Sequence, residues 1–277
     1  MFVILFVPIF VHAAAPSLNV LPENLIQGEP VIVRIEGLSD ITQVIAVMFG
    51  KQALQPFLLG GTVAALYGVD LNMKAGEYVV AVNLIDGTKL EKKVIVLGRK
   101  KYEAPLGIPQ KLGGNSTTSQ TVLVNTLAIE NAQLAALATG KKAFWTLFFQ
   151  YPVKDPFVTD EYGYTRTTGQ YSITHKGVDL RASSTTRVSS INRGVVRLVK
   201  TFRNYGKTIV VDHGLGVMSF YMHLSKVLVN QGELVLPGQL IGYAGQTGYA
   251  EKPHLHLTVR INGVSIDPII FIKLLGR

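Results

Sequence analysis

The chain has 277 residues, of which 48% are hydrophobic and 16% charged, and its formal net charge is +9 at pH 7. This length allows two globular domains with real cores. There is no cysteine, which excludes a disulfide framework, an iron–sulfur cluster and a thiol nucleophile, so that any zinc would have to be held by histidine and carboxylate.

The amino-terminal stretch MFVILFVPIFVHAAA, residues 1–15, opens with ten apolar residues and ends in small ones. This pattern is typical of a secretory signal peptide, although no lysine or arginine precedes the apolar run. The run is shorter than the ~20 residues that span a bilayer, so no stable transmembrane segment is predicted. We therefore expect an exported protein, periplasmic or extracellular; a buried amino-terminal strand is the alternative.

Residues 16–98 consist of short β-prone runs separated by turns, as in PVIVRIEGL, TQVIAVMFG and EYVVAVNLIDGTKLEKKVIVL. The pair Asp86–Gly87 between two alternating runs predicts a β-hairpin. No long amphipathic helix interrupts the strands. The segment has the size of an immunoglobulin-like β-sandwich, without the cysteine and tryptophan hallmarks of antibody domains. Such a domain could position substrate or cover a site in the domain that follows.

Residues 99–121, RKKYEAPLGIPQKLGGNSTTSQT, have the Gly, Pro, Ser, Thr and Lys content of a linker. The Ala- and Leu-rich residues 124–142 predict one helix, with Asn125 to cap its start and Gly140 to end it. We expect residues 99–144 to form a linker with one helix that packs on a neighbouring domain.

From Trp145 onward the sequence again consists of short β-prone runs, which include GVVRLVKTF, KTIVVDHG, VMSFYMHL, QLIGYAG and HLHLTVRING. The predicted fold class is therefore mainly β, with an amino-terminal immunoglobulin-like sandwich, a linker with one helix, and a carboxyl-terminal antiparallel β domain over residues 145–277. This last domain carries 15 Lys and Arg against 8 Asp and Glu, which suits an anionic polymer. The basic residues are scattered, so nucleic acid is not the expected partner.

Two of the six histidines, His254 and His256, lie one residue apart in KPHLHLTVR. The surrounding leucines and valine predict a strand, in which residues i and i+2 point to the same face. Two imidazoles side by side fill a core poorly but suit a metal or catalytic site. A pair of hydrogen-bonded structural histidines is the alternative.

The segment SITHKGVDLRA places His175, Gly177 and Asp179 in alternation, so all three face one way in an extended chain. A glycine between two polar side chains leaves space above the backbone and indicates that something approaches closely. A histidine, a carboxylate and a second histidine from HLH would complete a catalytic zinc set with one position left for water.

Other hydrolytic sites are less well supported by the sequence. Neither His-Glu-x-x-His nor His-x-x-Glu-His occurs, which excludes the helical zincin arrangements, and no Gly-x-Ser-x-Gly supports a serine hydrolase. Asp155, Asp160 and Glu161 could supply the paired acids of a retaining glycosidase, but the sequence offers no apolar pocket around them.

Four segments follow one another in an order and spacing that resemble a known family: HKGVD (175–179), VVDHGLGVMSFYMHLS (210–225), GELVLPGQLIGYAGQTG (232–248) and KPHLHL (252–257). They resemble the lysostaphin-type M23 metallopeptidases, zinc endopeptidases that cut peptide cross-links in bacterial peptidoglycan. The resemblance covers roughly residues 145–272. It implies a compact, mostly antiparallel β domain with Zn²⁺ in an open groove.

The resemblance also implies the roles of five residues. His175, Asp179 and His256 would be the zinc ligands, and His223 and His254 the catalytic pair. Chemically, His254 could take the proton of a zinc-activated water, because its ordinary pKa lies near working pH. His223 could stabilise the oxyanion or orient the water. Which histidine performs which step stays open.

Other residues of these segments have structural explanations. His213 follows a predicted strand and precedes a Gly-x-Gly turn, so we expect it and Asp212 to be structural. Gly245 and Gly248 are expected to shape the loop beneath the groove.

The predicted function is zinc-dependent hydrolysis of peptidoglycan cross-links by an exported enzyme. The alternative is a non-catalytic wall-binding or regulatory protein on the same fold that acts through a partner hydrolase. Such proteins usually lose part of the metal set, whereas all five positions are present here. A purely structural β adhesin would leave the agreement between separate motifs to chance. Tyr249 to Lys252 replace the small, polar loop residues that the family pattern has before HLH. Lys252 and the Ser/Thr-rich residues 183–190 therefore leave the substrate preference open.

Overall fold

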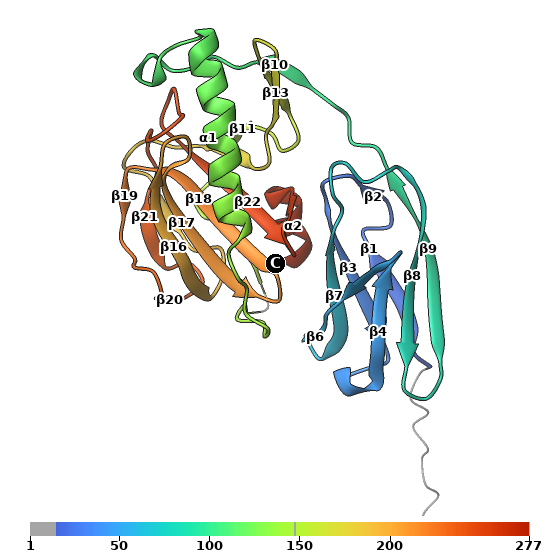
Figure 1. Ribbon diagram of the computed structural model, residues 1–277. Coiled ribbons are helices and arrows are strands. Elements are labelled where there is room, and N and C mark those ends of the chain that lie inside the picture. Colours follow the sequence, from blue (N-terminus) through green and yellow to red (C-terminus); the bar gives the residue numbers. More distant parts are fainter. Residues whose placement is uncertain (1–14, 147, 277) are drawn as a thin grey trace, which may run out of the picture.

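A computed structural model describes residues 15–146 and 148–276 of the chain. Apart from Ala15, the predicted signal peptide lies outside these residues. The described chain is mainly β, as the sequence predicts, with a β-sandwich followed by a helix and a larger β domain (Figure 1). No helix within the described residues is long and apolar enough to cross a bilayer.

The amino-terminal sandwich consists of two sheets that share one core. The first has the order β1 (Ser17–Leu21), β3 (Pro30–Glu36), β7 (Thr62–Gly68), β6 (Pro56–Leu59), and the second the order β2 (Leu25–Ile26), β9 (Lys89–Leu97), β8 (Gly76–Leu84), β4 (Val44–Phe49), β5 (Gln52–Leu54). Alternate residues such as Val33, Val63 and Val80 are fully buried between the sheets, as expected for strands with one apolar face. The likeness to immunoglobulin domains stays a prediction.

The predicted hairpin at Asp86–Gly87 is confirmed, since it joins β8 to β9. The φ angle of Gly87 is 87°, in the left-handed region that glycine tolerates, and the Asp86 carboxylate accepts a hydrogen bond from the amide of Thr88.

The carboxyl-terminal domain is built on a long antiparallel sheet. Its order is β11 (Val158–Asp160), β14 (Val178–Arg181), β22 (His254–Ile261), β18 (Val217–Leu224), β17 (Gly206–Gly214), β16 (Gly194–Phe202), β20 (Leu234–Val235), with β23 (Val264–Ile266) also paired to β22. Two smaller sheets complete it: β15 (Arg187–Ser189), β21 (Leu240–Tyr243), β19 (Lys226–Val227); and β10 (Glu103–Pro105), β12 (Thr165–Thr168), β13 (Tyr171–Thr174). Two 3₁₀ turns occur at Ile41–Gln43 and Gln110–Leu112.

The two faces of strand β22 have different roles. Leu255, Leu257 and Val259 point into the main core of the domain, where they are fully buried. His254, His256 and Thr258 alternate with them and therefore point to the opposite face. The apolar side of the strand fixes its register, and the register places the histidines.

Helix α1 (Thr117–Ala135) starts earlier than predicted. Its N-cap is Ser116, whose hydroxyl accepts a hydrogen bond from the amide of Ser119, and its C-cap is Ala136. The prediction that Asn125 caps the helix and Gly140 ends it was therefore wrong. The Ser- and Thr-rich residues before it were interpreted as linker, but serine is also among the best N-cap residues.

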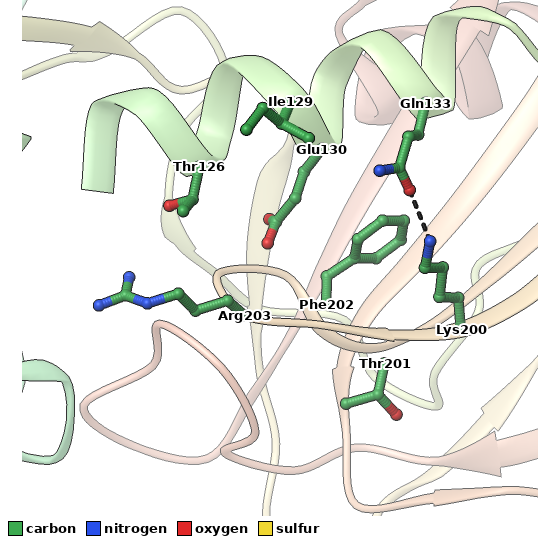
Figure 2. Close-up of a pocket in the computed structure, with 8 residues that line it drawn as sticks. All are labelled: Thr126, Ile129, Glu130, Gln133, Lys200, Thr201, Phe202 and Arg203. Carbon is green, nitrogen blue, oxygen red and sulfur yellow. Dashed lines mark hydrogen bonds between the residues drawn. The ribbon is translucent and has the colours of Figure 1, made fainter. Parts of the chain in front are cut away.

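Helix α1 lies across the histidine-bearing face of the sheet (Figure 1). Leu134 packs there with Phe220 and Met222 of β18. Figure 2 shows the shallow hollow between α1 and the end of β16, where Lys200 Nζ donates to Gln133 Oε1 over 2.6 Å. The buried carboxylate of Glu130 accepts the amide N–H of Asn204 over 3.0 Å, which joins the helix to the turn that follows β16.

Helix α2 (Pro268–Leu275) was not predicted from the sequence. Asp267 caps it by accepting the amides of Ile269 and Ile270, and proline occupies the first helical position. An Asp-Pro pair before an apolar run is a recognisable helix start, so the signal was present in the sequence.

The sandwich packs on α2 and β23, on the opposite face of the sheet from the histidines. Arg99 Nη2 lies 2.7 Å from Asp267 Oδ2, and Ile266 contacts Gly68 of β7 so closely that a Cβ there would overlap with it. Residues 15–98 make no hydrogen bond or ion pair with the five candidate site residues. The suggestion that the sandwich covers the site is therefore not supported by this arrangement.

Asp212 connects the segment after α1 to the large sheet. Its fully buried carboxylate accepts the Thr139 hydroxyl and the amides of Gly140 and Gly214, and it pairs with Arg197 through Nε at 2.9 Å and Nη2 at 2.8 Å. A carboxylate with this many donors stabilises the fold because no donor is left unpaired.

We expect Asp212→Ala to lower the free energy of unfolding by about 3 kcal/mol, because it leaves a guanidinium and buried N–H groups without an acceptor. Denaturant or thermal unfolding of the full chain would measure this. Glu91→Ala, at an exposed position on β9, is the control and should change stability by less than about 0.5 kcal/mol. Equal stability of the two variants would show that the Asp212 contacts are dispensable.

Candidate metal centre and catalytic histidines

The structure brings together His175, Asp179 and His256. Asp179 in β14 is directly paired with His256 in β22, and His175 lies in the turn just before β14. His256 Nδ1 is 2.8 Å from Asp179 Oδ1, and His175 Nε2 is 3.2 Å from that oxygen and 3.0 Å from His256 Nδ1. One ligand atom from each residue lies within 4.8 Å of the others. Such a group could hold a metal ion.

Gly177 allows His256 to reach this position. A Cβ on Gly177 would overlap with the His256 ring and would lie only 2.6 Å from both Leu257 O and Thr258 Oγ1. The sequence indicated a close approach at this glycine. The approaching group is the His256 side chain itself, so the space above the glycine is filled rather than left open.

Hydrogen bonds on the far side of each ring fix which nitrogen faces the cluster. His175 Nδ1 lies 2.9 Å from the carbonyl oxygen of Glu161, which can only accept, so Nδ1 carries the proton and Nε2 presents its lone pair. His256 Nε2 lies 3.0 Å from Thr258 Oγ1, and that hydroxyl donates its own proton to Lys176 O over 3.0 Å. The Thr258 oxygen therefore accepts from Nε2, and His256 presents Nδ1.

The protonation states also suit a cation. Burial lowers the pKa of His256, which keeps its imidazole neutral. Although burial acts to raise it, the pKa of Asp179 is held well below its usual range by His175 and His256. Burial acts to lower the pKa of His175, but the charge and hydrogen bond of Asp179 outweigh it and raise that pKa. A metal ion held by these three atoms would take the place of protons, because metal ligands must be deprotonated.

His223 is brought beside the cluster by a left-handed turn at the end of β18. Its φ angle is +61°, a conformation that costs a non-glycine residue about 1–3 kcal/mol. Its amide donates to Tyr205 O, and Nδ1 donates to Thr247 O over 2.9 Å. Its ring centroid is then 4.8 Å from that of His254. Burial, followed by the nearby His254 and His256, lowers the pKa of His223 to about 3, so the ring is neutral.

His254 completes the set on the same face. Its Nδ1 donates to the carbonyl of Lys252 over 2.9 Å, which leaves Nε2 with its lone pair 3.7 Å from Asp179 Oδ1. The side chains of His254 and Asp179 are 17% and 21% exposed, so water reaches the cluster from this side. All five residues singled out in the sequence are thus neighbours in space.

The segment of residues 103–112, which we term the strap, braces both loops that lead into the site. It pairs with β12 through β10, and Leu106 N donates to Thr167 O; β13, the partner of β12, runs directly into His175. At the other end Gly107 O accepts the hydroxyl of Tyr249 over 2.5 Å, and Lys111 Nζ donates to Gln246 O over 2.6 Å. The loop of Gln246 and Tyr249 leads into His254.

Gly245 and Gly248 shape this loop as predicted. A Cβ on Gly248 would overlap with Asn204 O and Gly206 N, and one on Gly245 would overlap with Ser225 N. The close packing of these backbones holds Thr247 O against His223. His213 lies elsewhere: Nδ1 is bonded to Arg193 O and Nε2 to Ser219 Oγ, each over 2.8 Å. It is a buried structural histidine, as expected, and burial lowers its pKa to about 4.

Sequence reasoning missed the groups behind the ligands. The sequence did not identify Thr258 or the carbonyl of Glu161 as partners of the histidines. It also did not identify Asp160 as a neighbour of His175. The Asp160 carboxylate lies 3.8 Å from His175 Nδ1 and forms an ion pair with Arg166. Thr258 alternates with His254 and His256 on β22, so the i, i+2, i+4 pattern could have found it. Carbonyl partners leave no trace in side-chain identity.

Comparison with known proteins identifies the domain that carries these residues. Residues 173–268 match the family described as peptidase family M23. The matched segment carries all five candidate site residues. The family implies a metal, in agreement with the His175, Asp179 and His256 group, and the resemblance found in the sequence is confirmed.

Two relatives and one solved structure illustrate the M23 similarity. Peptidoglycan DD-endopeptidase ShyA of Vibrio cholerae is 38% identical over 93 residues, 34% of this chain and 22% of that protein. Murein hydrolase activator EnvC of Escherichia coli is 34% identical over 127 residues, 46% of this chain and 28% of that protein. The matches thus span about a quarter of these relatives. A Pseudomonas aeruginosa crystal structure assigned to peptidase M23 matches with a TM-score of 0.65 and 25% identity, over 89% of this chain and 94% of that one.

We expect Thr258→Val to weaken metal binding by about 10- to 100-fold, because the hydroxyl that accepts from His256 Nε2 is lost and the ring is free to change tautomer or rotate. Competition with a chromophoric chelator would measure the affinity.

Thr258→Ser retains the hydroxyl and is the control for this variant. Metal affinity close to that of the unsubstituted protein is expected for it. If Thr258→Val bound metal as tightly as Thr258→Ser, the threonine would have no part in presenting Nδ1.

Proposed function

We propose that the chain is a zinc endopeptidase that hydrolyses peptide cross-links of bacterial peptidoglycan. The observation that carries the proposal is a group of three atoms whose lone pairs are directed to one point by hydrogen bonds on the other side of each imidazole ring. These atoms are His175 Nε2, Asp179 Oδ1 and His256 Nδ1, and His223 and His254 lie beside them. The similarity to ShyA, an enzyme named for this reaction, supports the substrate class.

Two imidazoles and a carboxylate fit zinc well. Without cysteine, a histidine and carboxylate set with three protein ligands is the usual catalytic zinc arrangement, and it leaves a coordination position for water. Bound there, zinc would polarise the scissile carbonyl and bring the pKa of water towards neutrality.

The chain's own groups supply the proton movements. His254 Nε2 carries a lone pair and lies beside Asp179, so His254 is placed to accept a proton from the attacking water and deliver it to the leaving nitrogen. His223 also presents a neutral Nε2, because Nδ1 donates to Thr247 O. This tautomer accepts a hydrogen bond, which suits orienting the water; donation to an oxyanion would need a second proton that burial opposes.

The proposal includes a location in the cell envelope, where peptidoglycan lies, and the predicted signal peptide agrees with export. The basic composition of residues 145–277 suits an anionic wall. The similarity to EnvC, which is named as an activator of murein hydrolases, supports one alternative function. In this alternative the chain is a regulator that acts through a partner hydrolase. The complete metal and histidine set favours the enzyme.

Removal of one ligand should abolish metal binding and cleavage together. We expect purified wild-type protein to contain close to one zinc per chain and to lower the turbidity of purified peptidoglycan, and His256→Ala to do neither. Mass spectrometry for metal and a turbidity assay would measure both. Zinc without lysis in the wild type would favour the regulator, and absence of both would reject the enzyme.

Removal of His254 should slow cleavage without loss of the bound metal. We expect His254→Ala to retain its zinc while its rate of cross-link cleavage falls by about 10²- to 10⁴-fold, the usual contribution of a general base. Cleavage products would be measured by chromatography, alongside metal content. An unchanged rate would remove His254 from the mechanism.

A further inference from the structure

Arg181 is a cation beside the catalytic histidines that the proposed mechanism does not use. In the register of β14 and β22 it is directly paired with His254, just as Asp179 is paired with His256. Directly paired residues of antiparallel strands project to the same face. Arg181 therefore projects on the histidine side of the sheet, two residues from Asp179, and is exposed.

The guanidinium is held by an aromatic ring instead of by an acid. Its central carbon lies 3.9 Å from the ring centre of Phe157, which is 53% exposed. Phe157 is in turn fixed by its carbonyl, which accepts the amide N–H of Arg181 over 2.9 Å. Stacking on an aromatic face leaves the N–H fork of the guanidinium available.

Three other arginines have their charge paired with a carboxylate of the protein. Arg99 pairs with Asp267, Arg166 with Asp160, and Arg197 with Asp212. Among residues 15–146 and 148–276, no side chain accepts a hydrogen bond from Arg181 or forms an ion pair with it. An ordered guanidinium with free donors is suited to a planar anion, and a carboxylate matches its two parallel N–H groups.

We propose that Arg181 is a specificity-determining residue that binds a carboxylate of the substrate peptide, one or two residues from the scissile amide. Two residues along a strand place Arg181 about 7 Å from Asp179, the length of about two extended peptide residues. The preferred substrates are thus cross-links in which a free carboxylate lies close to the cleaved bond. The inference rests on the proposed function for the identity of the substrate.

Binding of two synthetic cross-linked stem peptides tests this inference. The peptides are identical except that the carboxyl groups next to the cross-link are free in one and amidated in the other. Affinities would be measured by fluorescence titration at low ionic strength, on full-length zinc-loaded protein carrying His223→Ala to suppress cleavage. The carboxylate peptide is expected to bind about tenfold more tightly than the amide.

Arg181→Met in the same background retains the apolar stem against Phe157 and removes the charge. This variant should bind both peptides as weakly as the protein with Arg181 binds the amidated peptide. Its zinc content and melting temperature should be unchanged. Arg187→Met, at an exposed arginine of β15, is the matched control and should keep the tenfold preference.

Three results would overturn the inference: equal affinity for the two peptides before Arg181 is replaced, binding of neither, or a preference that survives in Arg181→Met. Failure of the proposed function looks different. Wild-type protein would then cleave neither peptide, while the carboxylate preference and its loss in Arg181→Met would persist.

Discussion

Three electron-pair donors held around one point are the constraint on which the rest of the carboxyl-terminal domain depends. His175 Nε2, Asp179 Oδ1 and His256 Nδ1 lie 2.8–3.2 Å apart. At this distance, atoms that each present an electron pair repel one another unless a proton or a cation lies between them. The surrounding structure must oppose their separation. The pairing of β14 with β22 does so for Asp179 and His256, and the missing side chain of Gly177 leaves room for the second ring.

Strands and loops make different contributions to this arrangement. Regular strands supply Asp179, His254 and His256, because pairing register is fixed by the apolar faces of the same strands. Irregular backbone supplies the carbonyls of Glu161, Thr247 and Lys252, each of which takes the Nδ1 proton of one histidine. His256 lies within a strand, where carbonyls are engaged in the ladder, and Thr258 takes the place of such a carbonyl.

Much of this could be predicted from the sequence, and the failures have physical reasons. Alternation in HKGVD and HLH identified same-face residues because a strand has a period of two. The start of α1 was misplaced because a Ser- and Thr-rich segment suits both a linker and an N-cap. The hydroxyl of Ser116 caps the first turn, and Thr121 of the same helix bonds Tyr171 of β13, a contact between distant segments that the sequence does not reveal. The left-handed turn at His223 was not foreseeable, since it depends on Tyr205 O and Thr247 O from distant segments.

The strap extends the structural unit that holds the candidate site beyond the β domain predicted from the sequence. Its sequence is that of a spacer, and a boundary drawn at Trp145 would discard it together with α1. Yet the strap ties the β-hairpin that enters His175 to the loop that enters His254, so it belongs to the scaffold of the site. Only residues 100–102 separate it from Arg99, which fastens the sandwich to α2. A fragment that keeps the candidate site braced on both sides therefore begins at Glu103 or earlier, and its amino-terminal border lies four residues after Arg99, where the sandwich is attached.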